Sequence, residues 1–181
     1  MGEHVLLIGM MGSGKSTVGR IVADRMRRPF RDSDVDVERR TGSSVPAIFA
    51  ARGEPAYRAE ERAALCAALT SFVPSVIAVA GGAVLDPESR RRLRSAGVVV
   101  WLDVAPHALA GRVGAGTGRP LLEVDPAGTL QRLDAVRRPV YRELSDVVVH
   151  VGARRPEELA EDVVRAARAQ LDSPTDGRSP W

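Results

Sequence analysis

The segment from Gly9 to Thr17 carries the clearest chemical signal in the sequence, because it fits the phosphate-loop pattern G-x-x-x-x-G-K-[ST] at every fixed position. The apolar run 5–8 before it predicts a buried strand and residues 18–23 after it predict a helix, which is the context that the pattern requires. Glycines let the backbone fold closely around an anion, and the positive end of the new helix favours the same charge. We therefore expect a phosphate cradle in which Lys15, the only lysine of the chain, reaches the β- and γ-phosphates and Ser16 offers its hydroxyl to Mg²⁺.

Two aspartates, Asp32 and Asp34, lie at the end of a short strand predicted at 29–32. Phosphoryl transfer needs a metal, cationic groups and a residue that orients the attacking hydroxyl. One carboxylate can hold Mg²⁺ while the other accepts a hydrogen bond from the hydroxyl and takes its proton. Aspartate is also a common turn residue and helix N-cap, and the pattern alone leaves that alternative open.

Three arginines are candidates for binding anions at the same site. The glycine-rich stretch 112–124 predicts a mobile lid, and Arg119 within it could close over the transferring phosphoryl group as an arginine finger. Arg58 and Arg137 belong to two predicted helices that are far apart in the chain. If these two converge on one pocket, their guanidinium groups form a fork for a carboxylate, but the sequence alone cannot show that convergence.

Two features at predicted strand ends have more than one interpretation. Gly81 and Gly82 allow backbone N–H groups to approach a ligand closely, and they are equally compatible with a plain turn. Asp103 ends an apolar run, as a metal-holding aspartate does, and it could instead cap the helix that begins near residue 106.

The composition indicates one globular domain. The chain has 181 residues, of which 44% are hydrophobic and 27% charged. No apolar run approaches the roughly 20 residues that span a bilayer, and no basic region precedes the first apolar run, so we expect a cytoplasmic protein without membrane attachment. The net charge of +3 suits anionic ligands, but basic and acidic residues are interspersed and only 4% of residues are aromatic, which argues against nucleic acid. Without a long heptad or an apolar stripe, we expect a monomer.

Predicted strands and helices alternate along the chain. Strands are expected at 5–8, 29–32, 76–79, 98–102 and 147–149, and helices at 15–27, 35–40, 44–51, 54–69, 87–95, near 106, 125–141 and 156–171. This alternation predicts an α/β fold, a three-layer doubly wound sheet of five parallel strands, with ligands at the carboxyl ends of the strands. We assign 1–171 to a single domain that contains a small helical substrate lobe at 33–62 and the lid at 112–124, followed by a disordered tail at 172–181.

Taken together, these residues resemble the shikimate kinase family from about residue 4 to residue 171. The matching segments are Gly12-Ser13-Gly14-Lys15-Ser16-Thr17, Asp32-Ser33-Asp34, Tyr57-Arg58 with Glu60-Glu61, Ala80-Gly81-Gly82-Ala83-Val84, Gly118-Arg119-Pro120-Leu121-Leu122 and Arg137-Arg138-Pro139-Val140-Tyr141. The phosphate loop is common to many kinases, whereas its combination with the later arginines is far more specific. The chain departs from the family at Ala80, where a third glycine is usual, and at Tyr57, where phenylalanine is more usual.

The resemblance implies a phosphate-loop NTP hydrolase fold like that of nucleoside monophosphate kinases. The implied reaction transfers the γ-phosphoryl group of ATP, with Mg²⁺, to the 3-hydroxyl of shikimate, and it belongs to the pathway to chorismate and aromatic amino acids. Carried over by position, the shikimate-binding residues are Asp34, Arg58, Gly81, Gly82 and Arg137, and the metal-binding residues are Ser16 and Asp32. The ATP-binding residues are Gly12, Ser13, Gly14, Lys15, Ser16, Thr17, Arg112, Arg119, Arg154 and Pro156, and the catalytic residues are Lys15, Asp34 and Arg119.

Two other functions share part of this pattern. A phosphate-loop kinase for another small hydroxy acid, such as gluconate, would use the same loop and aspartate pair, and only the resemblance at Arg58 and Arg137 argues against it. A non-catalytic nucleotide switch would need only the loop. The sequence contains neither a guanine-reading Asn-Lys-x-Asp motif nor an Asp-x-x-Gly switch after the third predicted strand, which argues against the switch.

Overall fold

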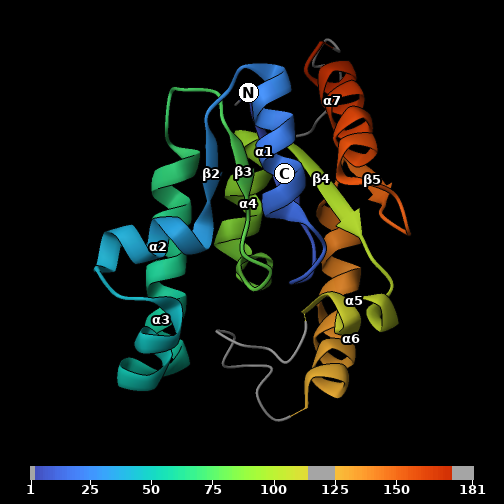
Figure 1. The fold of residues 1–181 in the computed structure, drawn as a ribbon. Coiled ribbons are helices and arrows are strands. Elements are labelled where there is room, and N and C mark those ends of the chain that lie inside the picture. The colour runs from blue at the N-terminus through green and yellow to red at the C-terminus, as the bar shows by residue number, and fades with distance from the viewer. Residues whose placement is uncertain (1–2, 114–124, 173–181) are drawn as a thin grey trace.

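The computed structural model, which describes residues 3–113 and 125–172, contains the five predicted strands in one parallel sheet (Figure 1). The strands are β1 (His4–Ile8), β2 (Phe30–Asp32), β3 (Val76–Ala78), β4 (Gly97–Asp103) and β5 (Val147–His150). They lie in the order β2-β3-β1-β4-β5, and every adjacent pair is parallel. The predicted α/β fold with a five-stranded parallel sheet is confirmed.

Helices cover both faces of the sheet. They are α1 (Lys15–Met26), α2 (Ser33–Thr41), α3 (Val45–Leu69), α4 (Pro87–Ala96), α5 (Pro106–Val113), α6 (Pro126–Leu144) and α7 (Pro156–Asp172), with a 3₁₀ turn η1 at Ala83–Leu85. Helices α1 and α7 pack against each other on one face, while α4 and α6 contact β4 from the other (Figure 1). Helices α2 and α3 stand together beside the β2 edge, as expected for an insertion between the second and third strands.

The central strand β1 explains why the sheet forms the core. Its neighbours β3 and β4 pair with it on both sides, and the side chains from Val5 to Ile8 are fully buried. A strand that is covered on both faces reads as a continuous apolar run in the sequence, which is why it could be predicted. The carboxyl end of this strand leads directly into the phosphate loop.

The structure refines several predicted boundaries. Helix α2 begins at Ser33, earlier than predicted, because the Asp32 carboxylate accepts a hydrogen bond from the backbone N–H of Asp34 and so caps the helix. The two helices predicted at 44–51 and 54–69 form the single span α3, which is broken by Gly53 at φ 76°. At Asp103, for which the sequence left a metal role and a helix cap open, the carboxylate accepts a hydrogen bond from Arg138 at 2.8 Å and lies 3.1 Å from His150 Nδ1.

Some predictions lie outside the described residues. The lid prediction at 112–124 overlaps the described chain only at Arg112 and Val113, which end α5, and Arg119 is not described. The predicted tail overlaps it only at Asp172, the last residue of α7. Among the helices of the described residues, none has the length and apolar character that crossing a membrane would need.

Gly97 provides a test of the sheet. A Cβ atom at this position would lie 2.7 Å from both the backbone N and the backbone C of His4 in the adjacent strand, which cannot move away without breaking the pairing of β1 with β4. We expect Gly97→Ala to lower the free energy of unfolding by about 3 kcal/mol or more, measured by urea denaturation. Gly111→Ala, where no atom lies within 4 Å of the new Cβ, is the matched control and should stabilise α5 by about 0.5–1 kcal/mol. Equal effects of the two substitutions would contradict the close approach of β1 and β4.

Candidate functional site

A cavity of about 530 Å³ lies at the carboxyl ends of β1, β2 and β3. Residues from distant parts of the chain form its wall, as expected for a ligand site in a parallel sheet. Of the residues predicted from the sequence, the wall includes Gly12, Gly14, Lys15, Ser16, Thr17, Asp32, Asp34, Arg58, Gly81, Gly82, Arg112 and Arg137. The phosphate loop and both arginines of the expected carboxylate fork therefore share one cavity.

The phosphate loop has the conformation that its glycines predict. Gly9, Gly12 and Gly14 all have positive φ angles, of 142°, 79° and 92°, and α1 begins immediately after them, so its N-terminus faces the loop. The Lys15 ammonium donates to the carbonyl of Gly9 at 2.8 Å and to that of Met10 at 3.0 Å, which holds it across the loop. This is an anion-binding cradle with a cation beside it.

Ser16 and Asp32 form the pair of oxygen ligands expected for a metal. The Ser16 hydroxyl donates to Asp32 Oδ2 at 2.6 Å, and the other carboxylate oxygen caps α2. Mg²⁺ is commonly held by one or two protein oxygens together with nucleotide phosphates and water. Among residues 3–113 and 125–172, no group of three or more histidine, cysteine, aspartate or glutamate side chains could hold a metal without such help. The chemistry of Ser16 and Asp32 therefore fits Mg²⁺ that arrives with a nucleotide.

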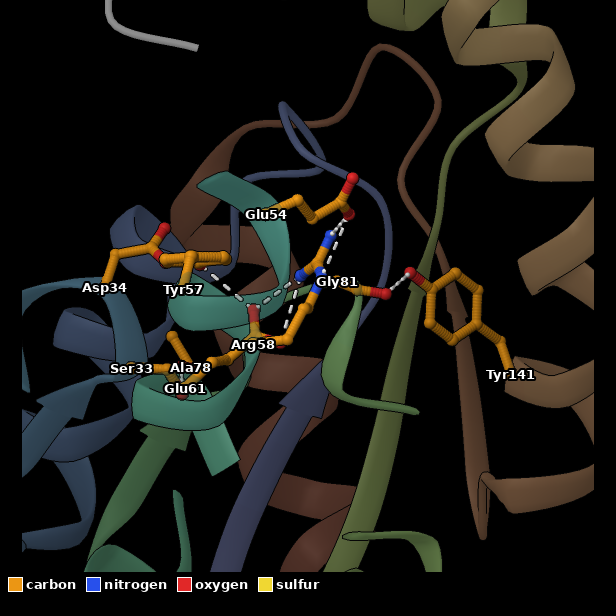
Figure 2. Close-up of polar contacts among 9 residues, drawn as sticks. All are labelled: Ser33, Asp34, Glu54, Tyr57, Arg58, Glu61, Ala78, Gly81 and Tyr141. Carbon is orange, nitrogen blue, oxygen red and sulfur yellow. Dashed lines mark hydrogen bonds and ion pairs between the residues drawn. The ribbon is translucent and has the colours of Figure 1, made fainter. Parts of the chain in front are cut away.

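A polar network connects α2 with α3 on the opposite wall of the cavity (Figure 2). The Tyr57 hydroxyl lies 2.9 Å from Asp34 Oδ1 and 3.0 Å from Glu61 Oε1. The Arg58 Nη1 donates to both carboxylate oxygens of Glu61, at 2.9 and 3.0 Å, and the Nη2 donates to Glu54 at 2.9 Å. One connected set of side chains thus extends from the aspartate pair to the first arginine of the fork.

Burial and charge both shift the ionisation of this network. Desolvation raises the pKa of Glu61, which is 1% exposed, and the Arg58 guanidinium opposes this shift. Desolvation also raises the pKa of Tyr57 far above its usual value, with the charges of Glu61 and Asp34 adding to the effect, so the hydroxyl stays protonated. Asp34 is exposed and lines the cavity. Partial desolvation of its carboxylate raises its pKa, and the Tyr57 hydrogen bond opposes that rise.

Arg137, on α6, reaches the cavity from the side opposite Arg58. The side chain is only 2% exposed, and within the described part of the chain its Nε has no hydrogen-bond partner. Asp134, one turn earlier in α6, is bound by Arg138 instead at 2.7 Å. A buried guanidinium is costly unless it meets an anion, so this position favours an acidic ligand.

The glycine pair after β3 lies between the two arginines. A Cβ atom on Gly81 would lie 3.1 Å from Arg137 Nη1, and a Cβ atom on Gly82 would lie 2.6 Å from Arg58 Cζ. The absence of these side chains therefore lets both guanidinium groups approach the same turn. The Tyr141 hydroxyl donates to the carbonyl of Gly81 at 3.0 Å, and burial raises its pKa to about 12.

Three of the predicted ATP-binding residues lie away from the cavity wall. Ser13 is 1% exposed, and its hydroxyl has no partner among the described atoms. Arg154 binds Asp162 at 2.6 Å, and Pro156 begins α7. Arg112, which does line the cavity, donates to the carbonyl of Gly152 at 2.7 Å and so lies beside the loop that carries Arg154.

The sequence analysis gave no role to Glu61 or Tyr57, although both lie in a segment that it quoted. The spacing of Arg58 and Glu61, three residues apart on one helix, was the available signal, because such pairs are neighbours on a helix surface. Tyr57 and Glu61 are four residues apart and meet for the same reason. The contact between Tyr57 and Asp34 joins two helices and had no signal in the local pattern.

The chain is similar to known proteins along most of its length. The sequence model of the shikimate kinase family matches residues 11–168 of this chain. A shikimate kinase from Pseudomonas syringae pv. tomato is 42% identical over 90% of this chain and 94% of its own length, and one from Burkholderia thailandensis is 45% identical over 82% of this chain and 81% of its own. A solved shikimate kinase from Acinetobacter baumannii, in complex with shikimate, has a TM-score of 0.89 and 32% identity, and the match covers 94% of this chain and 95% of that one.

Gly82 tests how the Arg58 side chain is placed. We expect Gly82→Ala to displace the Arg58 guanidinium from Glu61, because the new methyl group would occupy its space. The backbone can stay in place, but the buried Glu61 carboxylate loses its cation, so the free energy of unfolding should fall by about 1–3 kcal/mol. The ¹⁵Nε NMR signal of Arg58 reports the displacement, and the neighbouring Ala80→Gly is the control, since it adds no atoms. An unchanged Arg58 signal in Gly82→Ala would contradict this packing.

Proposed function

The chain belongs to the shikimate kinase family, and from that premise we propose that it transfers the γ-phosphoryl group of ATP to the 3-hydroxyl of shikimate. The activity of the family is ATP-dependent phosphotransfer to an alcohol, here giving shikimate 3-phosphate and ADP. The observation that carries the choice of acceptor is the pair of guanidinium groups, Arg58 and Arg137, that meets at Gly81 and Gly82 in the same cavity as the phosphate loop.

We propose that Arg58 and Arg137 bind the carboxylate of the acceptor. Guanidinium pairs with carboxylate through parallel N–H···O bonds, which fix the orientation of the acid as well as its position. Arg137 supports this role because it is buried without an anion among the described residues, whereas Arg58 is already held by Glu61 and Glu54. The backbone at Gly81 and Gly82 would contact the ring of the acceptor closely.

Asp34 is the residue that we propose orients the attacking hydroxyl. Its carboxylate lies on the cavity wall between the phosphate loop and the network of α3. In the transfer, the hydroxyl oxygen bonds to the γ-phosphorus, the bond from that phosphorus to the bridging oxygen of ADP breaks, and the hydroxyl proton passes to Asp34. Positioning contributes most of the rate in such reactions, so the fixed carboxylate matters as much as its basicity.

The remaining proposed residues act on ATP. Lys15 and the backbone of the phosphate loop bind the β- and γ-phosphates, and Ser16 and Asp32 would hold Mg²⁺, which, when bound, neutralises charge on those phosphates. We propose Arg119 as the catalytic arginine over the γ-phosphate, and the adenine site next to Arg112 and the loop that leads to α7. The residues proposed for nucleotide binding are Gly12, Ser13, Gly14, Lys15, Ser16, Thr17, Arg112, Arg119, Arg154 and Pro156. The monomeric state and the cytoplasmic location stay predictions.

Acceptor dependence separates the three functions that the sequence left open. In a coupled assay of ADP release with Mg²⁺–ATP, we expect shikimate to be the preferred acceptor and gluconate and quinate to give much lower kcat/KM. Preference for gluconate would identify a kinase for another hydroxy acid. ADP release that is independent of any acceptor would favour a nucleotide switch.

Arg137 provides the most specific mutational test of the acceptor site. We expect Arg137→Ala to lower kcat/KM for shikimate by the equivalent of about 2–4 kcal/mol, through a higher KM for shikimate, while the KM for ATP stays nearly unchanged. Arg142→Ala is the matched control, because Arg142 is an exposed arginine of the same helix. Equal damage to shikimate and ATP binding would count against a role in holding the acceptor.

A further inference from the structure

Tyr57 occupies a central place in the network although no step of the proposed reaction uses it. Its hydroxyl is within hydrogen-bond distance of two carboxylates, Asp34 at 2.9 Å and Glu61 at 3.0 Å (Figure 2). Glu61 in turn accepts two hydrogen bonds from Arg58. Among the described residues, the hydroxyl therefore links the residue proposed to orient the acceptor hydroxyl with a residue proposed to hold the acceptor carboxylate.

Packing alone does not account for this hydroxyl. Tyr57 is 5% exposed, and its ring packs against Phe49, with ring centroids 4.8 Å apart. A phenylalanine ring would make the same apolar contacts, whereas the hydroxyl brings a polar group into a buried site and is stable there only with polar partners. Its partners here are two acidic groups of the cavity wall.

Without the hydroxyl, Asp34 and Glu61 would face each other as like charges. The Tyr57 O–H, which can donate to either carboxylate, lies between the two charges. Glu61 is almost completely buried and its position is set by Arg58. The hydroxyl therefore fixes the more exposed carboxylate, that of Asp34, against a rigid buried group.

We propose that Tyr57 is a positioning residue for the phosphotransfer, whose hydroxyl holds the Asp34 carboxylate at a fixed distance from Glu61 and Arg58. The two ends of the acceptor site, one for the hydroxyl and one for the carboxylate, are then parts of one hydrogen-bonded assembly. The inference rests on the roles proposed for Asp34 and Arg58, and it adds a residue that acts through the Asp34 carboxylate.

Tyr57→Phe tests the inference, because it keeps the ring and removes only the hydroxyl. We expect kcat with shikimate to fall about tenfold and the KM for shikimate to rise, while the KM for ATP stays within about twofold of the wild-type value. Urea denaturation of the same variant shows whether the fold is retained. A merely structural role would lower stability and disturb both substrates alike, so this split separates positioning from packing.

The chain offers a matched control in its other tyrosine. Tyr141→Phe also removes a buried hydroxyl, but that hydroxyl donates to the backbone carbonyl of Gly81, lies beside the Arg137 guanidinium and has no carboxylate partner among the described residues. We expect Tyr141→Phe to act mainly on the KM for shikimate, through Arg137 and Gly81, and to lose much less kcat than Tyr57→Phe. Equal losses of kcat in the two variants would overturn the proposed link to Asp34.

Asp34→Asn separates failure of the inference from failure of the proposed function. If Asp34→Asn keeps full activity, Asp34 does not orient the acceptor and the proposed function of the site is wrong in that respect. If Asp34→Asn loses activity while Tyr57→Phe retains the wild-type kcat, only the positioning role of Tyr57 is wrong. A loss in both variants, with an unchanged KM for ATP in Tyr57→Phe, supports the inference.

Discussion

A buried guanidinium group is stable only when an anion balances its charge. The part of the cavity that we propose binds the acceptor follows from this requirement. Arg137 is 2% exposed, and Asp134, the acidic residue one turn earlier in its helix, is bound by Arg138. Arg58, on the opposite wall, has Glu61 and Glu54 as partners. Of these two arginines, Arg58 has its charge balanced within the protein, whereas Arg137, without an ion-pair partner among the described residues, favours an anionic ligand, because desolvated charges are stable only when paired.

The parallel sheet brings this pair of arginines to the phosphate loop. Because β1 is the central strand, its carboxyl end places the loop beside the ends of β2 and β3, which carry Asp32 and the glycine pair. Helices α3 and α6 then approach from the two sides, and glycine after β3 leaves space for the guanidinium group of each. The proposed phosphate and acid sites thus depend on the same topological feature, the aligned carboxyl ends of parallel strands.

The elements with strong local signals were predicted correctly. Buried strands appear as apolar runs, and the phosphate loop has a fixed pattern of glycines, so both follow from local sequence. The convergence of Arg58 and Arg137 could not be derived in that way, because it depends on how α3 and α6 pack against the sheet. Asp103 shows the same limit: its partners, Arg138 and His150, come from two other elements, and neither predicted role anticipated them. Family resemblance supplied the arginine pair, but not the contacts of Tyr57.

The most direct test of the central claim is a crystal structure of this chain with shikimate bound. The account predicts the carboxylate of shikimate within hydrogen-bond distance of both Arg58 and Arg137, next to Gly81 and Gly82, with a ring hydroxyl at Asp34. Such an arrangement would show that the buried charge of Arg137 is balanced by the acceptor. Shikimate bound through its carboxylate to neither arginine, or to Arg58 alone with Arg137 still lacking an anion, would contradict the account.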